Sequence, residues 1–151
     1  MKKEFKNFFE HKNFLVCGGC GFMGSNFIHY VLNNFSGTKV INLDLLTYAG
    51  NKDNLIGVPA ERHEFVKGDI CDTALAAKLM KEVDFVVNFA AETHVDRSIH
   101  SGADDFIRSN IIGVHSLLKA LQSSPNVKKM IQISTDEVWG DLPLKSKSKF
   151  N

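Results

Sequence analysis

The sequence predicts an α/β fold, a doubly wound parallel sheet with helices on both faces. Two patterns carry this prediction. Short apolar runs alternate with amphipathic stretches along the chain, and this alternation is typical of a parallel sheet with right-handed crossovers. The first apolar run also ends in a cluster of glycines that precedes an amphipathic stretch, which predicts a strand, a tight turn and a helix in that order.

Five apolar runs predict the strands. The first run is short and continuous, as expected for a strand that is buried on both faces of a parallel sheet. The first has the sequence NFLVCG and ends at the glycine cluster. The runs cover residues 13–18, 39–44, 63–69, 84–91 and 128–135.

Three stretches between these runs predict helices. Residues 73–82 are rich in strong helix formers, and residues 104–123 carry apolar side chains at helical spacing. The stretch that follows the glycines ends at a stop signal over residues 33–37, and one of its faces is apolar, with Phe27, Ile28, Val31 and Leu32. Residues 45–61 are irregular, and long irregular segments of compact domains often carry function.

Composition narrows the function classes. The chain has 151 residues, 44% of them hydrophobic, and a net charge of +1, which predicts one globular domain. The near-zero charge gives no electrostatic reason to expect nucleic acid or an anionic membrane as partner, and no apolar run reaches the roughly 20 residues of a membrane span. The odd number of cysteines, Cys17, Cys20 and Cys71, and their apolar or glycine-rich surroundings predict reduced thiols and a cytoplasmic protein. Cys17 and Cys20 form a C-x-x-C, whose alternative is zinc or redox chemistry, but without a second pair we expect no metal site.

The glycine cluster predicts a dinucleotide-binding turn. Residues 18–24 read GGCGFMG and fit the G-x-G-x-x-G pattern between a predicted strand and a predicted helix. Asp44 ends the second strand 20 residues after Gly24, where its carboxylate can accept hydrogen bonds from a ribose and repel a 2′-phosphate. With no arginine near Asp44 in the sequence, this combination favours NAD over NADP. The alternative is that the glycines serve only a tight turn and Asp44 only caps a loop.

Two polar segments follow the fourth and fifth strands. In α/β sheets ligands bind beyond the carboxyl ends of the strands, so both segments are candidate site residues. Residues 90–98 read AAETHVDRS, and residues 134–140 read STDEVWG. The neighbouring carboxylates Asp136 and Glu137 can act as acid and base if their environments differ. They can equally begin the next helix, since acidic residues favour a first turn.

These segments resemble one family. GGCGFMGSNF, NLDLLTYAGN, GDI, NFAAETHVDRSI and STDEVWGDL are similar to the nucleotide-sugar 4,6-dehydratases of the extended short-chain dehydrogenase/reductase superfamily. The resemblance runs from about residue 13 to residue 142. It implies NAD-dependent oxidation at the sugar C4, loss of water across C5 and C6, and return of the hydride to C6, with dTDP-glucose as the first substrate to expect.

The resemblance also assigns residues. Glu137 matches the base that removes the C5 proton, Asp136 the acid that protonates the leaving C6 hydroxyl, and Thr135 the hydroxyl that bonds at C4. Thr93 and Thr135 match substrate contacts. The matching cofactor residues form a Rossmann-type NAD site made of Gly18, Gly21, Phe22, Met23, Gly24, Asp44, Leu45, Leu46, Thr47, Asp69, Ile70, Phe89, Ala90, Ala91, Glu92, Thr93 and Ser109.

One part of the family pattern is missing. Members carry a Tyr-x-x-x-Lys pair beyond the Thr, whereas the tyrosines here, Tyr30 and Tyr48, both come before Thr135. Tyr48 does have Lys52 four residues on, but this pair lies in the irregular segment after Asp44 and not at the family's position. We therefore expect a Rossmann domain truncated after its fifth strand, with an extension at 1–12, the NAD-binding part at 13–142, a basic tail at 143–151 and no substrate domain. Such a chain is expected to be inactive alone. The family's homodimer stays an open expectation, because a single long helix is predicted where dimers pack two.

Other functions fit parts of the same pattern. A stand-alone NAD(H)-binding or regulatory fragment needs the glycine turn and Asp44 alone. Within the superfamily, a UDP-glucose 4,6-dehydratase or a nucleotide-sugar epimerase or decarboxylase shares the cofactor residues, although epimerases and decarboxylases usually lack consecutive Asp and Glu after the Thr.

Overall fold

A five-stranded parallel sheet forms the centre of the computed structural model, which describes residues 8–94, 103–135, 138 and 140. The strand order is β3-β2-β1-β4-β5, so the chain moves outward from β1 in both directions. The strands are β1 (Asn13–Cys17), β2 (Lys39–Asp44), β3 (His63–Lys67), β4 (Phe85–Asn88) and β5 (Lys129–Gln132). This order is the doubly wound arrangement of a Rossmann-like domain, as predicted.

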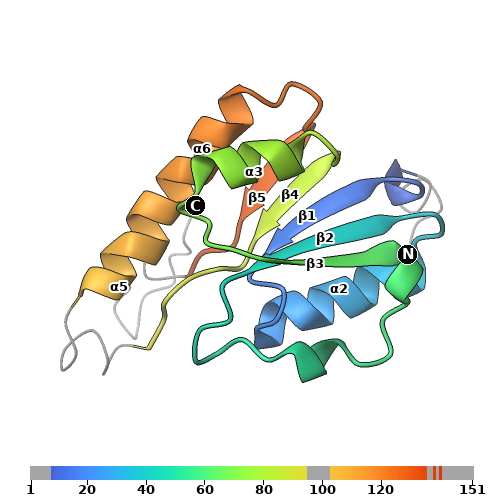
Figure 1. Ribbon diagram of the computed structural model, residues 1–151, viewed down its shortest axis with the longest axis horizontal. Coiled ribbons are helices and arrows are strands. Elements are labelled where there is room, and N and C mark those ends of the chain that lie inside the picture. Colours follow the sequence, from blue (N-terminus) through green and yellow to red (C-terminus); the bar gives the residue numbers. More distant parts are fainter. Residues whose placement is uncertain (1–7, 95–102, 136–137, 139, 141–151) are drawn as a thin grey trace, which may run out of the picture.

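Helices cover both faces of the sheet. Figure 1 shows α2 (Phe22–Asn34) on one face, and α3 (Thr73–Met80) and α6 (Val114–Gln122) on the other. A short helix, α5 (Asp104–Phe106), and a π-helical segment, η3 (Ile107–Gly113), run directly into α6, so the predicted helix over 104–123 is confirmed with a wider turn in its middle. Between β2 and β3 the chain forms only the 3₁₀ turns η1 (Lys52–Leu55) and η2 (Ala60–Arg62).

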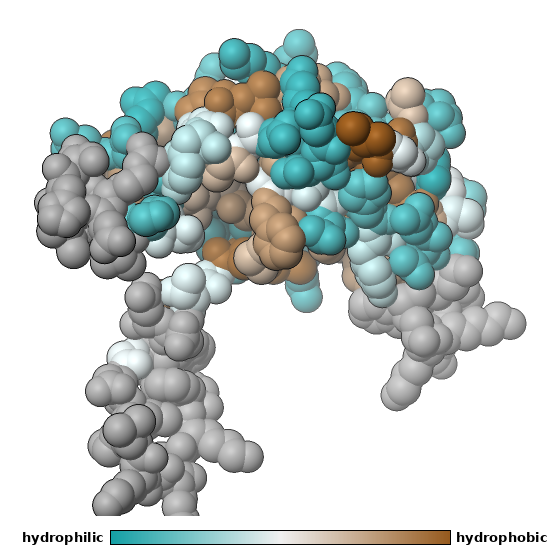
Figure 2. Space-filling view, turned by 90° about the horizontal axis from the view of Figure 1, so that it is seen from below, coloured by the Kyte–Doolittle hydropathy of each residue, from teal (hydrophilic) through white to brown (hydrophobic). Residues whose placement is uncertain are grey.

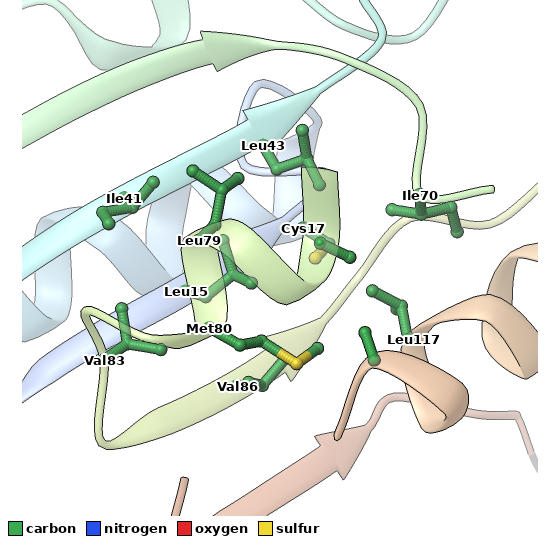
Figure 3. Close-up of a cluster of buried hydrophobic side chains, with 12 residues drawn as sticks. Leu15, Cys17, Ile41, Leu43, Ile70, Leu79, Met80, Val83, Val86 and Leu117 are labelled. Carbon is green, nitrogen blue, oxygen red and sulfur yellow. The ribbon is translucent and has the colours of Figure 1, made fainter. Parts of the chain in front are cut away.

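The two faces of β1 contribute to two separate cores. Successive side chains of a strand point to opposite faces. Leu15 and Cys17 therefore pack with α3 and α6, while Phe14 and Val16 pack with α2. Figure 3 shows the first core, in which Leu79 and Met80 of α3 lie among strand residues.

Aromatic rings close the second core at the amino-terminal end of the sheet. Phe9 lies 5.4 Å from Phe85 and 5.5 Å from Phe35 between ring centroids, and Phe14 stacks on Phe85 at 5.2 Å. The backbone carbonyl of Phe9 accepts a hydrogen bond from Thr38 Oγ1. The described part of the predicted N-terminal extension is thus packed onto the sheet.

Several predicted strands end earlier than expected. The predicted fourth strand continues to Ala91, but β4 ends at Asn88 because its side-chain Oδ1 accepts the N–H of Ala90 at 3.0 Å and turns the chain. Similarly, β3 ends at Lys67, and Asp69 Oδ1 accepts the N–H of Cys71. These early ends leave the described residues 90–94 and 68–72 outside the sheet, where side chains can face a ligand.

The surface is mixed in character. On the face drawn in Figure 2, hydrophobic residues lie in separate small groups among hydrophilic ones. Within the described residues, none of the helices is both long and apolar enough to cross a membrane.

Candidate functional site

A cleft of about 280 Å³ lies beyond the carboxyl ends of the strands. It is lined by most of the residues that the sequence assigns to the cofactor. The glycine turn and the start of α2 contribute Gly18, Gly21, Phe22, Met23 and Gly24, and the segment after β2 contributes Asp44, Leu45 and Thr47. The remaining lining residues from the prediction are Asp69, Ile70, Phe89, Ala90, Ala91, Glu92, Thr93 and Ser109.

The lining also differs from the prediction in a few places. Leu46 is not among the lining residues, whereas Leu43, Ala49, Gly50 and Gly68 are. A Cβ on Gly50 would lie 3.0 Å from Oδ1 of Asp44, so this glycine lets the loop fold onto the carboxylate. In the sequence, the small residues in the loops after β2 and β3 were the signal that could have identified these additional lining residues.

The glycines of the turn have two different tasks. Gly18 has a φ of +74°, and a Cβ there would lie 2.6 Å from the backbone nitrogen of Ala90. A Cβ on Gly24 would collide with the carbonyl oxygen of Gly18. Gly21 is different, because its Cβ would meet only that same oxygen, at 3.4 Å, within the described chain. Gly18 and Gly24 are therefore needed for packing, and Gly21 keeps open space in the cleft.

The amino-terminal end of α2 faces this space. Gly21 is its N-cap residue in an extended conformation, without a side-chain cap, and the first turn carries no acidic residue. The first backbone N–H groups of a helix have no acceptor inside the helix, and together with the helix dipole they attract anions. Phe22 and Met23 are 81% and 58% exposed at this position, which leaves two apolar side chains at the mouth of the cleft.

Asp44 is held by both of its carboxylate oxygens. The N–H of Cys20 donates to Oδ2 at 2.8 Å, and the N–H of Leu46 donates to Oδ1 at 2.7 Å. Leu46 has a φ of +58°, a conformation that costs about 1–3 kcal/mol for a non-glycine residue and indicates that the turn is strongly held. Each carboxylate oxygen keeps a further acceptor position, so Asp44 can still receive a hydroxyl.

The loop after β2 is tied to the glycine turn through Cys20. The carbonyl oxygen of Cys20 accepts the N–H of Asn51 at 3.0 Å and the side-chain amide of Asn54 at 2.9 Å. The carbonyl of Asn54 in turn pairs with His29 Nε2 of α2 at 3.0 Å. These bonds fix the side of the cleft that Asp44, Leu45 and Thr47 form.

Asp69 forms an ion pair at the cleft. Arg108 donates to its Oδ2 from Nη2 at 2.7 Å and from Nε at 3.2 Å, and the N–H of Cys71 donates to Oδ1 at 2.8 Å. Partial burial alone raises the pKa of Asp69, but the bonds from Cys71 and Arg108 outweigh it and lower the pKa below its usual value. The sequence offered no arginine near Asp44, and the fold brings Arg108 instead to the neighbouring strand end.

Asn110 of η3 holds the segment that follows β4. Its side-chain oxygen accepts the N–H of Glu92 at 2.9 Å, and its side-chain nitrogen donates to the Glu92 carbonyl at 2.8 Å. At the start of the segment, Asn88 donates to Gln132 Oε1 of β5 at 2.8 Å. Sequence reasoning missed both asparagines, because their partners lie 18 and 44 residues away.

The predicted catalytic residues follow β5. Thr135 is exposed and is not among the residues that line the cleft. Asp136 and Glu137 lie outside the described residues. The catalytic assignment of all three residues therefore stays a prediction.

The cysteines of the turn are buried thiols. Burial, with a smaller effect of the Asp44 charge, raises the pKa of Cys17 to about 12, and the same two causes raise the pKa of Cys20. Thiols that remain protonated at neutral pH are poor nucleophiles and poor metal ligands. Within the described ranges, His, Cys, Asp and Glu side chains form no group of three or more that could hold a metal ion.

Comparisons with known proteins agree with this geometry. A family model described as GDP-mannose 4,6 dehydratase matches residues 15–150. A low-salt glycan biosynthesis protein of Haloferax volcanii is 50% identical over 129 residues, which are 85% of this chain and 41% of that protein. A dTDP-glucose 4,6-dehydratase of Mycolicibacterium smegmatis is 44% identical over 137 residues, 91% of this chain and 40% of the relative. The chain thus spans about 40% of the length of these curated relatives.

Solved structures give the same result. The crystal structure of dTDP-glucose 4,6-dehydratase from Bacillus anthracis in complex with NAD is similar with a TM-score of 0.78 and 39% identity, over 91% of this chain and 42% of that one. DesIV, a dTDP-glucose 4,6-dehydratase from Streptomyces venezuelae with NAD and TYD bound, gives 0.78 and 43% identity over 87% and 42%. A UDP-glucose 4-epimerase from Brucella ovis in complex with NAD gives 0.73 and 28% identity over 86% and 38%.

Proposed function

This chain belongs to the GDP-mannose 4,6-dehydratase family, and from that premise we propose that its cleft binds NAD as part of a dTDP-glucose 4,6-dehydratase. The observation that carries the proposal is Gly21. It lines the cleft, yet a Cβ there would meet only one atom of the described chain, at 3.4 Å, so the need for glycine comes from what fills the cleft. Backbone amides that approach a pyrophosphate closely are the usual reason for such a glycine.

The pyrophosphate and the adenosine ribose of the dinucleotide each have matching residues. The first-turn N–H groups of α2 attract the pyrophosphate, and the exposed Phe22 and Met23 lie against it. Asp44, already oriented by two backbone N–H groups, accepts the hydroxyls of the adenosine ribose. Because an ionised carboxylate repels a 2′-phosphate, the same residue selects NAD over NADP.

NAD, when bound, supplies a reversible acceptor for the hydride at the sugar C4. For the chain's own residues we propose a hydrogen bond at C4 and proton transfers at C5 and at the C6 oxygen. Thr135 donates a hydrogen bond at the C4 oxygen, Glu137 takes the proton from C5, and Asp136 gives a proton to the leaving C6 oxygen. Consecutive Asp and Glu after the Thr favour a dehydratase over the epimerases that share the fold.

Binding is the activity that we propose for these 151 residues by themselves. The one Tyr-x-x-x-Lys spacing in these 151 residues is Tyr48 with Lys52, in the segment after β2, where Lys52 Nζ lies 3.8 Å from the centroid of the Phe65 ring. We do not assign this pair to the step that takes the proton from the C4 hydroxyl, because the family's pair follows the Thr. Loss of one positioned acid or base costs about 10²- to 10⁴-fold in rate. A stand-alone binding module would show the same behaviour with NAD, and the consecutive Asp136 and Glu137 after Thr135 are what favours the dehydratase.

The proposal is tested in two steps. Calorimetric titration of the purified chain with NAD⁺ is expected to give saturable binding with one site per chain. Incubation with dTDP-glucose and NAD⁺ is expected to give no 4-keto-6-deoxy product from the 151 residues alone. Absence of NAD⁺ binding by the folded chain contradicts the proposed cleft, and formation of product contradicts the restriction to binding.

A further inference from the structure

Arg108 is the one arginine that the fold brings against a residue lining the cleft within the part of the chain that the structure describes. It lies on η3 directly before the cleft residue Ser109, and its Nη2 and Nε both donate to Oδ2 of Asp69. The other oxygen of Asp69 accepts the N–H of Cys71. The carboxylate is therefore held on both sides while it still faces the cleft.

The ion pair between Arg108 and Asp69 contributes little to the free energy of folding. The side chain of Arg108 is 60% exposed, and exposed ion pairs contribute only about 0–1 kcal/mol. The pair acts mainly on Asp69, since two guanidinium donors on Oδ2 and the Cys71 N–H on Oδ1 together fix the orientation of the carboxylate, and the neighbouring cation favours its charged form. An ionised carboxylate only accepts hydrogen bonds, and each of its oxygens can accept more than one.

The position of Asp69 in the cleft indicates which group of the ligand its carboxylate contacts. Asp69 follows β3, the neighbour of β2, whose last residue Asp44 is assigned to the adenosine ribose. The base attached to that ribose then lies at the Asp69 and Ile70 end of the cleft. Adenine offers an exocyclic amino donor there, whereas hypoxanthine offers a carbonyl oxygen at the same ring position, which a carboxylate repels.

We propose that Arg108 is a positioning residue that fixes the Asp69 carboxylate as an acceptor for the exocyclic amino group of the base, and thereby sets the preference of the cleft for adenine over hypoxanthine dinucleotides. This inference rests on the proposed binding of NAD. It assigns to Arg108 an effect on the choice of base, which a merely structural arginine would not have.

The test compares two ligands on the full 151-residue chain. Dissociation constants for NAD⁺ and for nicotinamide hypoxanthine dinucleotide are measured by calorimetry for the unchanged chain, Arg108→Gln and Arg108→Lys. The unchanged chain is expected to prefer NAD⁺ by at least about tenfold. Arg108→Gln is expected to reduce this preference by about 3- to 30-fold, which lies within the range of coupling between contacting residues, and Arg108→Lys to restore part of it.

Two further variants separate positioning from folding. Arg62→Gln is the matched control, because Arg62 donates to the carbonyls of Leu32 and Phe35 and does not line the cleft, so it should leave the preference unchanged. In an Asp69→Asn background, Arg108→Gln should have no further effect on the preference. An unchanged preference in Arg108→Gln, with NAD⁺ still bound by the parent chain, overturns this inference and leaves the proposed function intact. If the parent chain binds neither dinucleotide, the proposed function itself fails.

Discussion

The backbone N–H of Cys20 donates a 2.8 Å hydrogen bond to Oδ2 of Asp44, across 24 residues of sequence. The bond joins the glycine turn, which follows β1, to the last residue of β2. The glycine turn and the Asp44 carboxylate, which we propose bind the pyrophosphate and the ribose, are thus one unit whose geometry is set by the chain's own hydrogen bonds. A site that is fixed in this way loses less freedom on binding.

Asp44→Asn is expected to weaken both the fold and the site. An amide side chain keeps one acceptor oxygen, so its nitrogen must face the N–H of either Cys20 or Leu46. Leaving a buried donor unsatisfied costs about 1–3 kcal/mol, which should appear as a lower urea midpoint. Affinity for NAD⁺ should fall at least tenfold. Asp53→Asn, on the exposed turn η1, is the control, and equal effects from the two variants would contradict the role of Asp44.

Asn110→Ala is expected to release the segment after β4. The reciprocal hydrogen bonds between Asn110 and the backbone of Glu92 are lost together. Amide hydrogen exchange at Glu92 should become faster by an order of magnitude or more, while exchange in β1 stays the same. Asn126→Ala removes bonds to Met80 and Val83 away from the cleft and serves as the control. Unchanged exchange at Glu92 in Asn110→Ala would show that other contacts hold the segment.

The lowered pKa of Asp84 predicts that this residue contributes to the loss of stability in acid. Burial alone raises its pKa, but the N–H of Asn13 and the charges of Lys128 and Lys12 lower it below the ordinary 3.8. Because the pKa is lower in the folded state, the stabilisation is present above pH 3.8 and is lost as the pH falls through the folded-state value. Asp84→Asn should therefore lose less stability than the parent chain between pH 5 and pH 3, as measured by urea unfolding. Parallel losses in the two proteins would contradict this prediction.

Features that are local in the sequence were predicted well. The glycine turn, Asp44 and residues 90–93 after β4 could be found because strand ends in a parallel sheet meet at one edge. The exact lining was less accessible, since Leu46 takes a left-handed conformation and is absent from the lining. That conformation depends on its hydrogen bond to Asp44 and has no signal in the residue type.

Contacts that depend on the packing of distant segments could not be predicted. Arg108 meets Asp69 across 39 residues, and their pairing is possible because the helix over 104–122 packs close to the segment after β3 at Gly113. A Cβ on Gly113 would collide with Ile70, so this glycine sets the close approach. The π-helical turns of η3 add to the difficulty, because they shift the helical register on which a sequence-based placement relies.

The most direct test of the dinucleotide-binding cleft is a calorimetric titration with NAD⁺ of the parent chain and of Gly21→Ala, with Gly24→Ala as the packing control. The added Cβ at Gly21 lies in the cleft and has an ordinary contact with Gly18, whereas the one at Gly24 collides with the chain itself. We predict that Gly21→Ala melts within about 2 °C of the parent chain but binds NAD⁺ at least tenfold more weakly, and that Gly24→Ala is destabilised. NAD⁺ affinity in Gly21→Ala equal to that of the parent chain would contradict the assignment of this cleft to the dinucleotide.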